Sequence, residues 1–259
     1  PVTAVVFRDG VPDPDRVVLV DTGVTDRTLE RADEVAGDKY VAIKYGWVDF
    51  SAARNAGIEF AKKLGAKWIV IVDSDERINF GDVKLRAALM RVKADVLLVE
   101  SSDGHYPKEK ILRAVSKARF YGPTHEALLG GYKKQLLRGV TFSELPKTDA
   151  QLAHKFERDI ELLEKFTTKH PDDPRWWYYL GSSYEGAGER EPAVEAYGKC
   201  ARLRKVGYEA AWAFYKEATL LLELDLPFEA IEAAVIGLYA DATFAECACV
   251  AAEASLKVG

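Results

Sequence analysis

The sequence predicts an α/β domain with a mostly parallel, Rossmann-like sheet, followed by an all-α domain of helical repeats. Two observations predict this order. β-branched runs alternate with amphipathic segments in the first half of the chain, and from about residue 151 only helical periodicity remains. A chain of 259 residues, 48% of them hydrophobic, is long enough to bury two cores. We therefore expect one domain over residues 1–147 and a second over residues 148–259.

The first domain is expected to alternate strands with helices, which is typical of a parallel sheet covered by helices. Ser51 stands where the N-cap of the second helix belongs. About nine residues separate the first two strands, fewer than a parallel crossover needs, so we expect a segment between them to be missing from this chain. The expected strands are residues 2–7, 17–21, 40–43, 68–73 and 96–100, and the expected helices are residues 25–35 and 51–64.

The second half of the chain resembles an array of tetratricopeptide repeats. Gly181 and Ala193 are small enough to let two antiparallel helices cross closely, while large aromatic side chains fill the space beside them. A weaker second copy covers residues 211–241, and a third begins near residue 242. An ordinary helical bundle is the alternative interpretation. The first repeat is defined by Trp177, Leu180, Gly181, Tyr184, Ala193, Tyr197 and Cys200.

Composition and charge narrow the class of protein. A net charge of −5 argues against a protein that coats nucleic acid through its whole surface. Cys200, Cys247 and Cys249 lack the spacing of a disulfide framework or a zinc site, and their place on apolar helical faces predicts reduced core thiols. No apolar run approaches the roughly 18 residues of a membrane span, and no signal-peptide pattern opens the chain. We expect a cytoplasmic protein with no membrane partner.

The acidic end of one expected strand is the strongest chemical signal. The apolar run 68–72 continues into Asp73, Asp75 and Glu76. Open α/β sheets bind ligands at the carboxyl ends of their strands. Two aspartates at i and i+2 are able to reach one divalent cation, which bridges the oxygens of a nucleotide diphosphate. Taken alone, an Asp-x-Asp after a strand is more often a cap or a turn than a metal site.

Two further segments favour the metal-site interpretation of Asp73 and Asp75. Asp21 ends another expected strand, before a turn that contains Gly23. Asp21 either accepts a hydrogen bond from a uracil-type base edge or simply forms the turn. Arg54 lies one turn into an expected helix. It is able to pair with a phosphate or with the carboxylates near Asp73, and the alternative is a surface arginine.

A histidine and a glutamate lie side by side about 50 positions after the acidic turn. His125 is a candidate metal ligand, although a lone histidine is more often a surface or core residue. Glu126 is a candidate general base for the proton of an acceptor.

Together and in this order, these segments resemble the family 2 inverting glycosyltransferases of the GT-A fold, in the bacterial and phage branch fused to tetratricopeptide repeats. That pattern comprises a valine-aspartate-threonine-glycine turn, an aspartate-phenylalanine-serine-x-x-arginine-asparagine segment, a tryptophan-led strand with an acidic end, and a later histidine-glutamate pair. This sequence matches it at residues 20–23, 49–55, 68–76 and 125–126. The resemblance covers nearly the whole chain.

The resemblance implies that a sugar moves from a nucleotide-diphosphate donor, by preference UDP-linked, with the help of Mn²⁺ or Mg²⁺. It implies a metal site at Asp73, Asp75 and His125, with Asp75 also counted among the catalytic residues. Glu126 is the expected general base and Asp103 the second choice. Expected donor contacts are Asp21, Thr22, Gly23, Asp26, Arg54, Asp73 and Ser74.

The sequence departs from the family pattern at two places. Val24 stands where the family has serine. Phe7, Arg8, Asp9 and Gly10 stand where lysine-asparagine-glutamate is expected after the first strand. Both departures concern the expected pocket for the donor base.

The acceptor is open to several hypotheses. Residues 108–138 carry eight basic and two acidic side chains, a net charge of +6. Such a stretch serves the donor diphosphate, holds an anionic acceptor such as nucleic acid, or forms a solvated face. The repeats offer a concave surface for a peptide, a protein or another copy of the chain.

Two other functions compete with glycosyl transfer. A catalytically inactive scaffold would bind a protein partner through the repeats, but the retained chemical segments argue against it. A nucleotidyltransferase would need a glycine- and lysine-rich phosphate loop after the first strand, which the sequence lacks.

Overall fold

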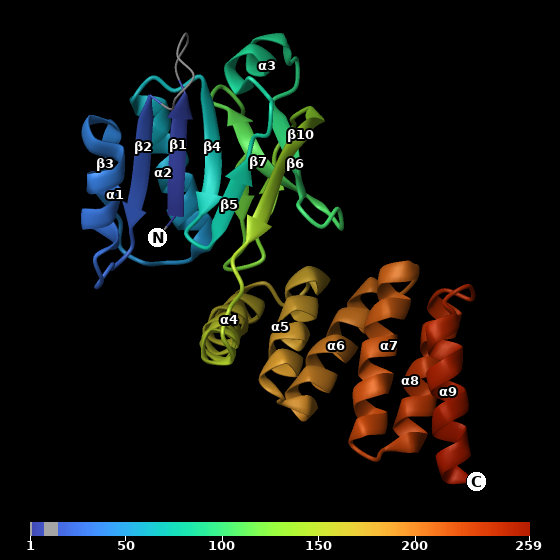
Figure 1. Ribbon diagram of the computed structural model, residues 1–259. Coiled ribbons are helices and arrows are strands. Elements are labelled where there is room, and N and C mark those ends of the chain that lie inside the picture. The colour runs from blue at the N-terminus through green and yellow to red at the C-terminus, as the bar shows by residue number, and fades with distance from the viewer. Residues whose placement is uncertain (1, 8–14) are drawn as a thin grey trace. The chain divides into compact units, whose positions relative to one another are not determined.

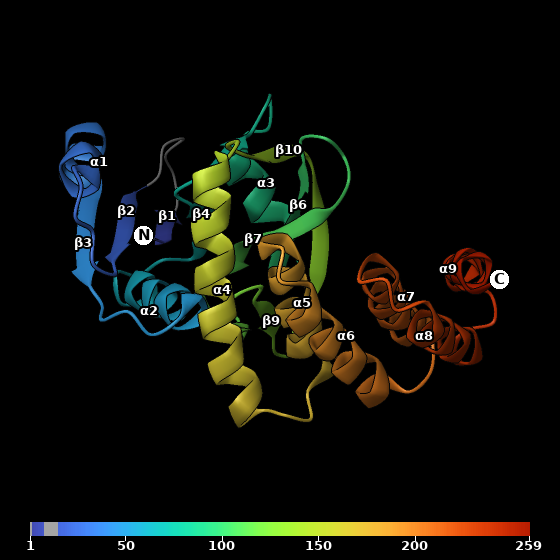
Figure 2. The same ribbon diagram turned by 90° about the horizontal axis from the view of Figure 1, so that it is seen from below.

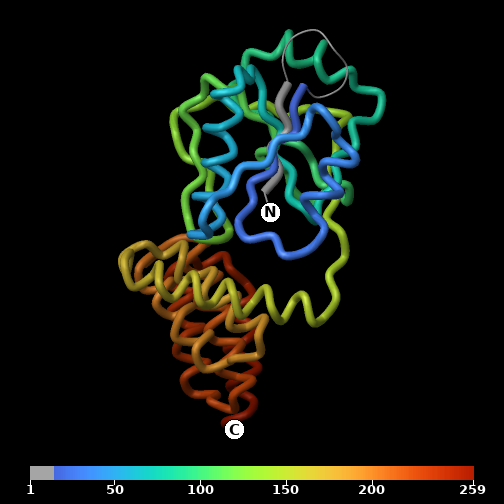
Figure 3. Tube along the Cα trace, turned by 90° about the vertical axis from the view of Figure 1, so that its left-hand side faces the viewer, coloured from blue at the N-terminus to red at the C-terminus, as the bar shows by residue number. Residues whose placement is uncertain are grey.

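The protein, described by a computed structural model over residues 2–7 and 15–259, divides into two units (Figure 1). These are Pro1–Pro146 and Lys147–Gly259, a division one residue before the boundary expected from the sequence. Figure 3 follows the chain from strand β10 (Lys134–Glu144) into helix α4 (Asp149–Lys169), where it passes from the first unit to the second. In the described part, no helix is both long and apolar enough to cross a membrane.

The first unit is built on an eight-stranded sheet in the order β3-β2-β1-β4-β7-β6-β10-β5. A small two-stranded sheet, β8-β9, accompanies it. The remaining strands of the large sheet are β1 (Val2–Phe7), β2 (Arg16–Asp21), β3 (Tyr40–Lys44), β4 (Trp68–Asp73), β5 (Glu76–Asn79), β6 (Val96–Ser101) and β7 (Pro107–Arg113). The small sheet pairs β8 (Arg119–Tyr121) with β9 (Ala127–Leu129), and the helices are α1 (Thr28–Ala36), the 3₁₀ turn η1 (Gly37–Lys39), α2 (Phe50–Lys63) and α3 (Leu85–Arg91).

The α/β class is confirmed, but the described sheet is mixed rather than mostly parallel. β2 pairs with β3, and β6 with β10, in parallel. The other five ladders, β1-β2, β1-β4, β4-β7, β6-β7 and β5-β10, are antiparallel. The prediction missed this because a buried strand has the same apolar pattern whichever way its neighbour runs.

The pairing of β1 removes the reason to expect a missing segment. That expectation assumed a parallel crossover, whereas β1 and β2 are antiparallel, and antiparallel strands need only a short connection. Residues 8–14, which include the departures Arg8, Asp9 and Gly10, lie outside the described residues. Since β1 is antiparallel to both β2 and β4, these two strands run in the same direction and end at the same edge of the sheet.

Helices cover both faces of the sheet, and β4 divides its side chains between them. Ile69 and Ile71 pack with Ile58 of α2 in one core cluster, on the side where Figure 2 shows α2 beneath the strands. Trp68 and Val70 pack into the opposite cluster, which also contains residues of α3. This alternation follows from the two-residue period of a strand and holds β4 between two apolar layers.

The second unit consists of consecutive helices, as the repeat interpretation of the sequence expects. Gly181 and Tyr197 carry the contact expected from the sequence, because a Cβ at position 181 would lie 2.9 Å from the Tyr197 ring. The predicted second copy is also helical, and its first helix places Phe214 and Ala218 in the core. After α4, its helices are α5 (Pro174–Ala187), α6 (Arg190–Arg204), α7 (Tyr208–Glu223), α8 (Pro227–Ala240) and α9 (Ala245–Val258).

The three cysteines are free, but they do not share one environment. Cys200 and Cys247 are buried, as expected for core thiols, whereas Cys249 is exposed. The apolar composition of α9 hid this difference, because alanine occupies both of its faces.

Candidate active site

The predicted site residues lie along the edge of the sheet where β2, β3 and β4 end. Val2 of β1 pairs with Val20 on one side and with Asp73 on the other. The turn that begins at Asp21 is therefore separated from Asp73 by the width of β1, roughly 10 Å or two strand spacings. The edge thus carries two acidic strand ends in fixed relation to each other.

The N-terminus of α2 approaches this edge and is capped by Asp49. The Asp49 carboxylate accepts hydrogen bonds from the Ala52 N–H at 2.7 Å and the Ser51 hydroxyl at 2.9 Å. The prediction of Ser51 as the N-cap was wrong by two residues, because the chain is already helical at Phe50. Capping by Asp49 fixes where the helix begins and hence which way Arg54 points.

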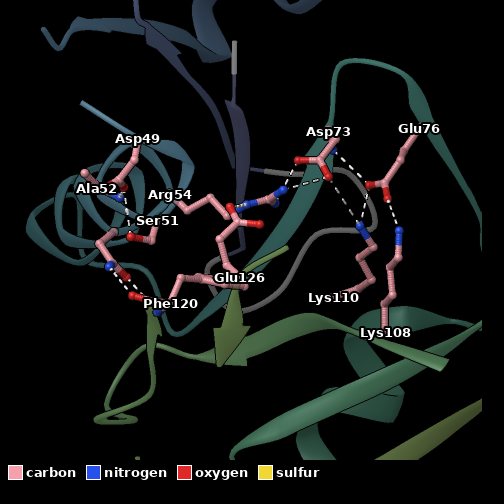
Figure 4. A network of polar contacts seen from close by, with 11 residues as sticks. Asp49, Ser51, Ala52, Arg54, Asp73, Glu76, Lys108, Lys110, Phe120 and Glu126 are labelled. Carbon is pink, nitrogen blue, oxygen red and sulfur yellow. Dashed lines mark hydrogen bonds and ion pairs between the residues drawn. The ribbon is translucent and has the colours of Figure 1, made fainter. Parts of the chain in front are cut away.

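Arg54 joins the two predicted carboxylates of the site (Figure 4). Its guanidinium grips Asp73 with two nitrogens, Nη1 at 2.7 Å from Oδ1 and Nη2 at 2.9 Å from Oδ2. The third nitrogen, Nε, donates to Oε1 of Glu126 at 2.8 Å. Of the two pairings predicted for Arg54, the structure contains the one with carboxylates. Sequence positions 54, 73 and 126 are thus joined by partly buried ion pairs, which we call the Arg54 bridge.

Asn55, next to Arg54, holds the segment that carries Glu126. Its side-chain amide donates to the Phe120 carbonyl at 2.8 Å and accepts from the Phe120 N–H at 3.0 Å, as a paired strand would. A third bond runs from the Phe50 N–H to the Pro123 carbonyl at 3.1 Å. His125 lies in this segment with a φ of 48°, in the left-handed region where few residues other than glycine are found. The bonds to α2 therefore keep Glu126 within reach of Arg54.

The polar network continues beyond Asp73 into residues that sequence reasoning missed. The Glu76 carboxylate accepts from the Asp73 N–H at 3.0 Å and forms a buried ion pair with Lys110. Lys110 Nζ also lies 4.0 Å from Oδ2 of Asp73, and Lys108 joins from the same strand, 3.5 Å from Glu76. The sequence showed Glu76 in the acidic turn and Lys110 in the basic stretch, but only the pairing of β4 with β7 places them together.

The charges of this network shift one another's pKa values. Burial opposes the ionisation of Asp73, but Arg54 and then Lys110 outweigh it and hold the pKa of Asp73 below its usual range. For Lys110 burial prevails, and its pKa is lowered in spite of Asp73 and Glu76. The pKa of Arg54 is raised by Asp73 and Glu126 against its burial. Asp73 is therefore a fixed anion at neutral pH.

Of the two roles predicted for Asp21, the structure contains the forming of the turn. The Asp21 carboxylate accepts from the Gly23 N–H at 3.0 Å and the Val24 N–H at 2.8 Å, and these bonds lower its pKa. Gly23 has a φ of 113°, which a residue with a side chain rarely adopts. Asp26 accepts from the Thr28 N–H at 2.9 Å at the start of α1. Contact of Asp21, Thr22, Gly23 and Asp26 with a donor base stays a prediction.

The predicted metal ligands are not assembled as a three-residue site. In the described part of the chain, no three His, Cys, Asp or Glu side chains gather closely enough to hold a metal ion. Asp73 is engaged by Arg54 and Lys110, and Asp75 follows it in the β4–β5 turn beside Ser74. A cation that arrives with a diphosphate needs only one or two carboxylates, because phosphate oxygens and water complete its shell. The residues present therefore fit a metal that is bound together with the donor.

Asp103, the second candidate for a general base, lies in the turn between β6 and β7. It accepts from the Ser101 hydroxyl at 2.5 Å and the His105 N–H at 3.1 Å, which lower its pKa. These are the bonds of a turn-forming aspartate. Glu126, by contrast, belongs to the Arg54 bridge.

The stretch 108–138 is less basic in the folded protein than its sequence suggested. Lys108, Lys110, Arg119 and Lys134 form ion pairs with acidic residues. Arg113 donates to the carbonyls of Val92 and Ala94 and stacks on Trp68. Five of the eight cations are thus engaged within the protein.

Comparison with known proteins gives a family match within the first unit and longer matches to two curated relatives. A model of the glycosyl transferase family 2 matches residues 7–104. Over 200 residues the chain is 26% identical to the SPbeta prophage-derived glycosyltransferase SunS of Bacillus subtilis (strain 168), and equally to glycosyltransferase SunS of Bacillus phage SPbeta. Each alignment covers 71% of this chain and 46% of the relative, so the chain spans about half the length of the curated relatives it matches.

Solved structures of helical repeats are similar to the C-terminal part of the chain. The TPR domain of Sgt2 from Aspergillus fumigatus is 18% identical, with 42% of this chain and 73% of that chain covered and a TM-score of 0.35. The type III secretion chaperone SycD of Yersinia enterocolitica is 16% identical, with 41% and 85% covered and a TM-score of 0.36.

Proposed function

We propose that the chain transfers a sugar with inversion from a nucleotide-diphosphate donor, preferably UDP-linked, to an acceptor, because residues 7–104 match a model of the glycosyl transferase family 2. The observation that carries this proposal is the Arg54 bridge, which holds Asp73 and Glu126 beside each other at the carboxyl end of β4. Ligands bind at this edge in open α/β sheets, and a transfer reaction needs one carboxylate for the donor and another for the acceptor.

The donor lies along the sheet edge in this proposal. The base contacts the turn of Asp21, Thr22, Gly23 and Asp26, and the sugar contacts Asp73 and Ser74. The spacing of roughly 10 Å between these two strand ends suits a nucleotide diphosphate that spans β1. Arg54 positions the carboxylates and does not grip phosphate, because all three of its nitrogens already contact acidic oxygens.

The leaving diphosphate is stabilised at the β4–β5 turn. Asp75 is the residue that would hold Mn²⁺ or Mg²⁺ there, and Asp73, with its two cationic partners, is left to hydrogen-bond the sugar. His125 remains a predicted ligand for the same cation. Bound at this place, the metal would neutralise charge on the leaving diphosphate.

Glu126 takes the proton of the acceptor. Arg54 engages its Oε1, and among the described contacts Oε2 has no partner and is available for a proton. As that proton leaves, the acceptor oxygen, sulfur or nitrogen bonds to the anomeric carbon while the bond to the diphosphate breaks. The nucleoside diphosphate departs with the electron pair, and the configuration at the anomeric carbon is inverted.

The acceptor is proposed as a hydroxyl, thiol or amine of a peptide, a nucleic acid base or a glycan. The extensive pairing of the basic residues in 108–138 makes the nucleic acid the least favoured of these. The helical unit is a candidate surface for a macromolecular acceptor or for a second copy of the chain.

Calorimetric titration with UDP tests the proposal. We expect binding that is strengthened by Mn²⁺, and we expect Asp75→Ala to remove the metal dependence and to lower UDP-sugar hydrolysis by 100-fold or more, on the order of the loss of an electrostatic stabiliser. Asp82→Ala, at an exposed aspartate before α3, is the matched control and keeps both properties.

Absence of binding by UDP, GDP and TDP alike would reject a nucleotide-sugar site and favour a scaffold that acts through the helical unit. Full activity of Asp75→Ala would keep the transferase and reject the proposed place of the metal.

A further inference from the structure

We propose that Lys110 is a positioning residue of the transfer reaction, which acts through Asp73 and the β4–β5 turn. The contact itself is independent of the reaction, whereas its effect on turnover rests on the proposed function. Asp73 lies between two cations, Arg54 on one side and Lys110 on the other (Figure 4).

Lys110 is enclosed almost completely. Its side chain is 3% exposed, and its partner Glu76 is 2% exposed. The ammonium faces Glu76 of β5, Asp73 of β4 and the ring of Phe142 in β10, whose centroid lies 5.2 Å away. Three strands thus meet at one buried charge.

The Lys110–Glu76 pair closes the turn that bears Asp75. Oε2 of Glu76 receives both the Lys110 ammonium and the Asp73 N–H, so that one carboxylate ties the last residue of β4 to the first residue of β5. Ser74 and Asp75 are the two residues enclosed by this tie. Lys110 therefore holds the Asp73 side chain directly and the position of Asp75 through Glu76.

Stability alone does not account for a lysine at this position. Ile111 and Leu112, the next residues of β7, are fully apolar and buried, and a buried ion pair stabilises a fold no better than well-packed apolar residues of the same volume. An ion pair instead fixes the orientation of the groups that its charges contact. The group oriented here is the carboxylate that the proposed reaction uses.

Lys110→Met is the variant that separates positioning from binding. Without the ammonium, Arg54 alone holds Asp73, and the β4–β5 turn loses its tie. We expect kcat for UDP-sugar hydrolysis, counted per UDP-binding site, to fall by about 10- to 100-fold, the range typical of partners that orient a functional group. KM and the calorimetric affinity for UDP stay within about threefold, because the base end of the donor lies across β1.

Lys63→Met is the control, since Lys63 is an exposed lysine in the last turn of α2, outside the network of Asp73, Glu76 and Lys110. Crystal structures of both variants give a second measurement that needs no donor. We expect the Asp73 carboxylate or the 74–75 turn to move in Lys110→Met and to stay in place in Lys63→Met.

Each outcome decides the matter. An unchanged kcat per site, or an unmoved Asp73 and turn in the crystal structure, overturns the role of Lys110 while leaving the transferase intact. If the wild-type protein binds no nucleotide, the proposed function fails. The crystal structures then test by themselves whether Lys110 holds Asp73 and the 74–75 turn in place.

If Lys110→Met does not fold because Glu76 is left buried and uncompensated, the double variant Glu76→Gln/Lys110→Met removes both charges together. It keeps an acceptor for the Asp73 N–H. The same loss of kcat is expected, and full activity of the double variant overturns the proposal.

Discussion

At the scale of single residues, the protein shows two acids with opposite environments, one partly buried and one buried. Asp73 lies between two cations and stays ionised, as a group that must contact a ligand in one charge state requires. Glu217, in α7 of the helical unit, is 7% exposed at its side chain and has Arg202 at 3.1 Å as its ion-pair partner. Among the described residues, Oε2 of Glu217 has no hydrogen-bond partner. Burial therefore outweighs Arg202, and the pKa of Glu217 is raised.

The raised pKa of Glu217 predicts how the stability of the protein changes with pH. For an acid whose pKa is higher in the folded state, the favourable contribution is fully present below the unfolded pKa and is lost as pH rises through the folded pKa. At neutral pH ionisation of this side chain favours the unfolded state over the folded state, and we expect Glu217→Gln to unfold at a higher urea concentration than the wild type.

Near about pH 4, where a free glutamate is half protonated, this advantage shrinks. Urea denaturation at the two pH values measures the difference, with Glu223→Gln, an exposed glutamate of the same helix, as the control. A gain that is equal at both pH values would show that the charge of Glu217 is not its cause.

At the scale of elements, the site depends on how α2 is joined to its surroundings. Asp49 fixes the beginning of the helix, and Asn55 ties it to β8 through two hydrogen bonds with the backbone of Phe120. The geometry of Arg54 and Glu126 is therefore a property of the α2–β8 pair.

Asn55→Ala breaks this connection. The Phe120 N–H and carbonyl lose their partners, and we expect the free energy of unfolding to fall by about 1–3 kcal/mol, as for polar groups left unsatisfied. UDP-sugar hydrolysis falls as well, because Glu126 is no longer held against Arg54. Chemical denaturation and the hydrolysis assay measure the two effects, and Asn79→Ala, at an exposed position of β5, serves as control. A stable but inactive variant would assign Asn55 to the chemistry instead.

The sequence predicted the positions of the helices and strands better than the pairing between strands. The run that ends at Asp73 has an unmistakable apolar pattern, and Arg54 follows a helix start, so both could be predicted from local spacing. The direction of β1, and with it the mixed sheet, follows from long-range pairing that leaves no mark on a strand's own pattern. The buried contact between Lys110 and Glu76 was missed for the same reason, since a charged residue in a strand is expected to face solvent until a partner is known.

At the scale of the whole molecule, two units each bury a core of their own. Ile58, Ile69 and Leu112 belong to a cluster of the first unit, whereas Trp176, Leu163 and Leu180 belong to one of the second. Units with separate cores are able to unfold in separate steps, so a single free energy of unfolding need not describe the chain.

Gly181→Ala tests this separation. The added methyl group would lie 2.9 Å from the Tyr197 ring, and overpacking of this kind costs about 1–3 kcal/mol. We expect calorimetry to show two unfolding transitions, of which Gly181→Ala lowers one and leaves UDP binding intact, while Asn55→Ala lowers the other. Gly131→Ala, where no atom lies within 4 Å of the added carbon and φ is not positive, controls for the loss of backbone freedom. One transition that shifts as a whole in both variants would mean that the units unfold together.

The place of β1 between β2 and β4 has a consequence for how donor preference can change. In the proposed site, the base and the sugar are recognised at the ends of two strands that are not neighbours, and a third strand fixes their separation. Side-chain substitutions at one end leave the other end untouched, and none of them alters the spacing of hydrogen-bonded strands. Sugar preference and base preference are thus separable traits, open to independent selection or engineering, while the length of the donor is dictated by the backbone.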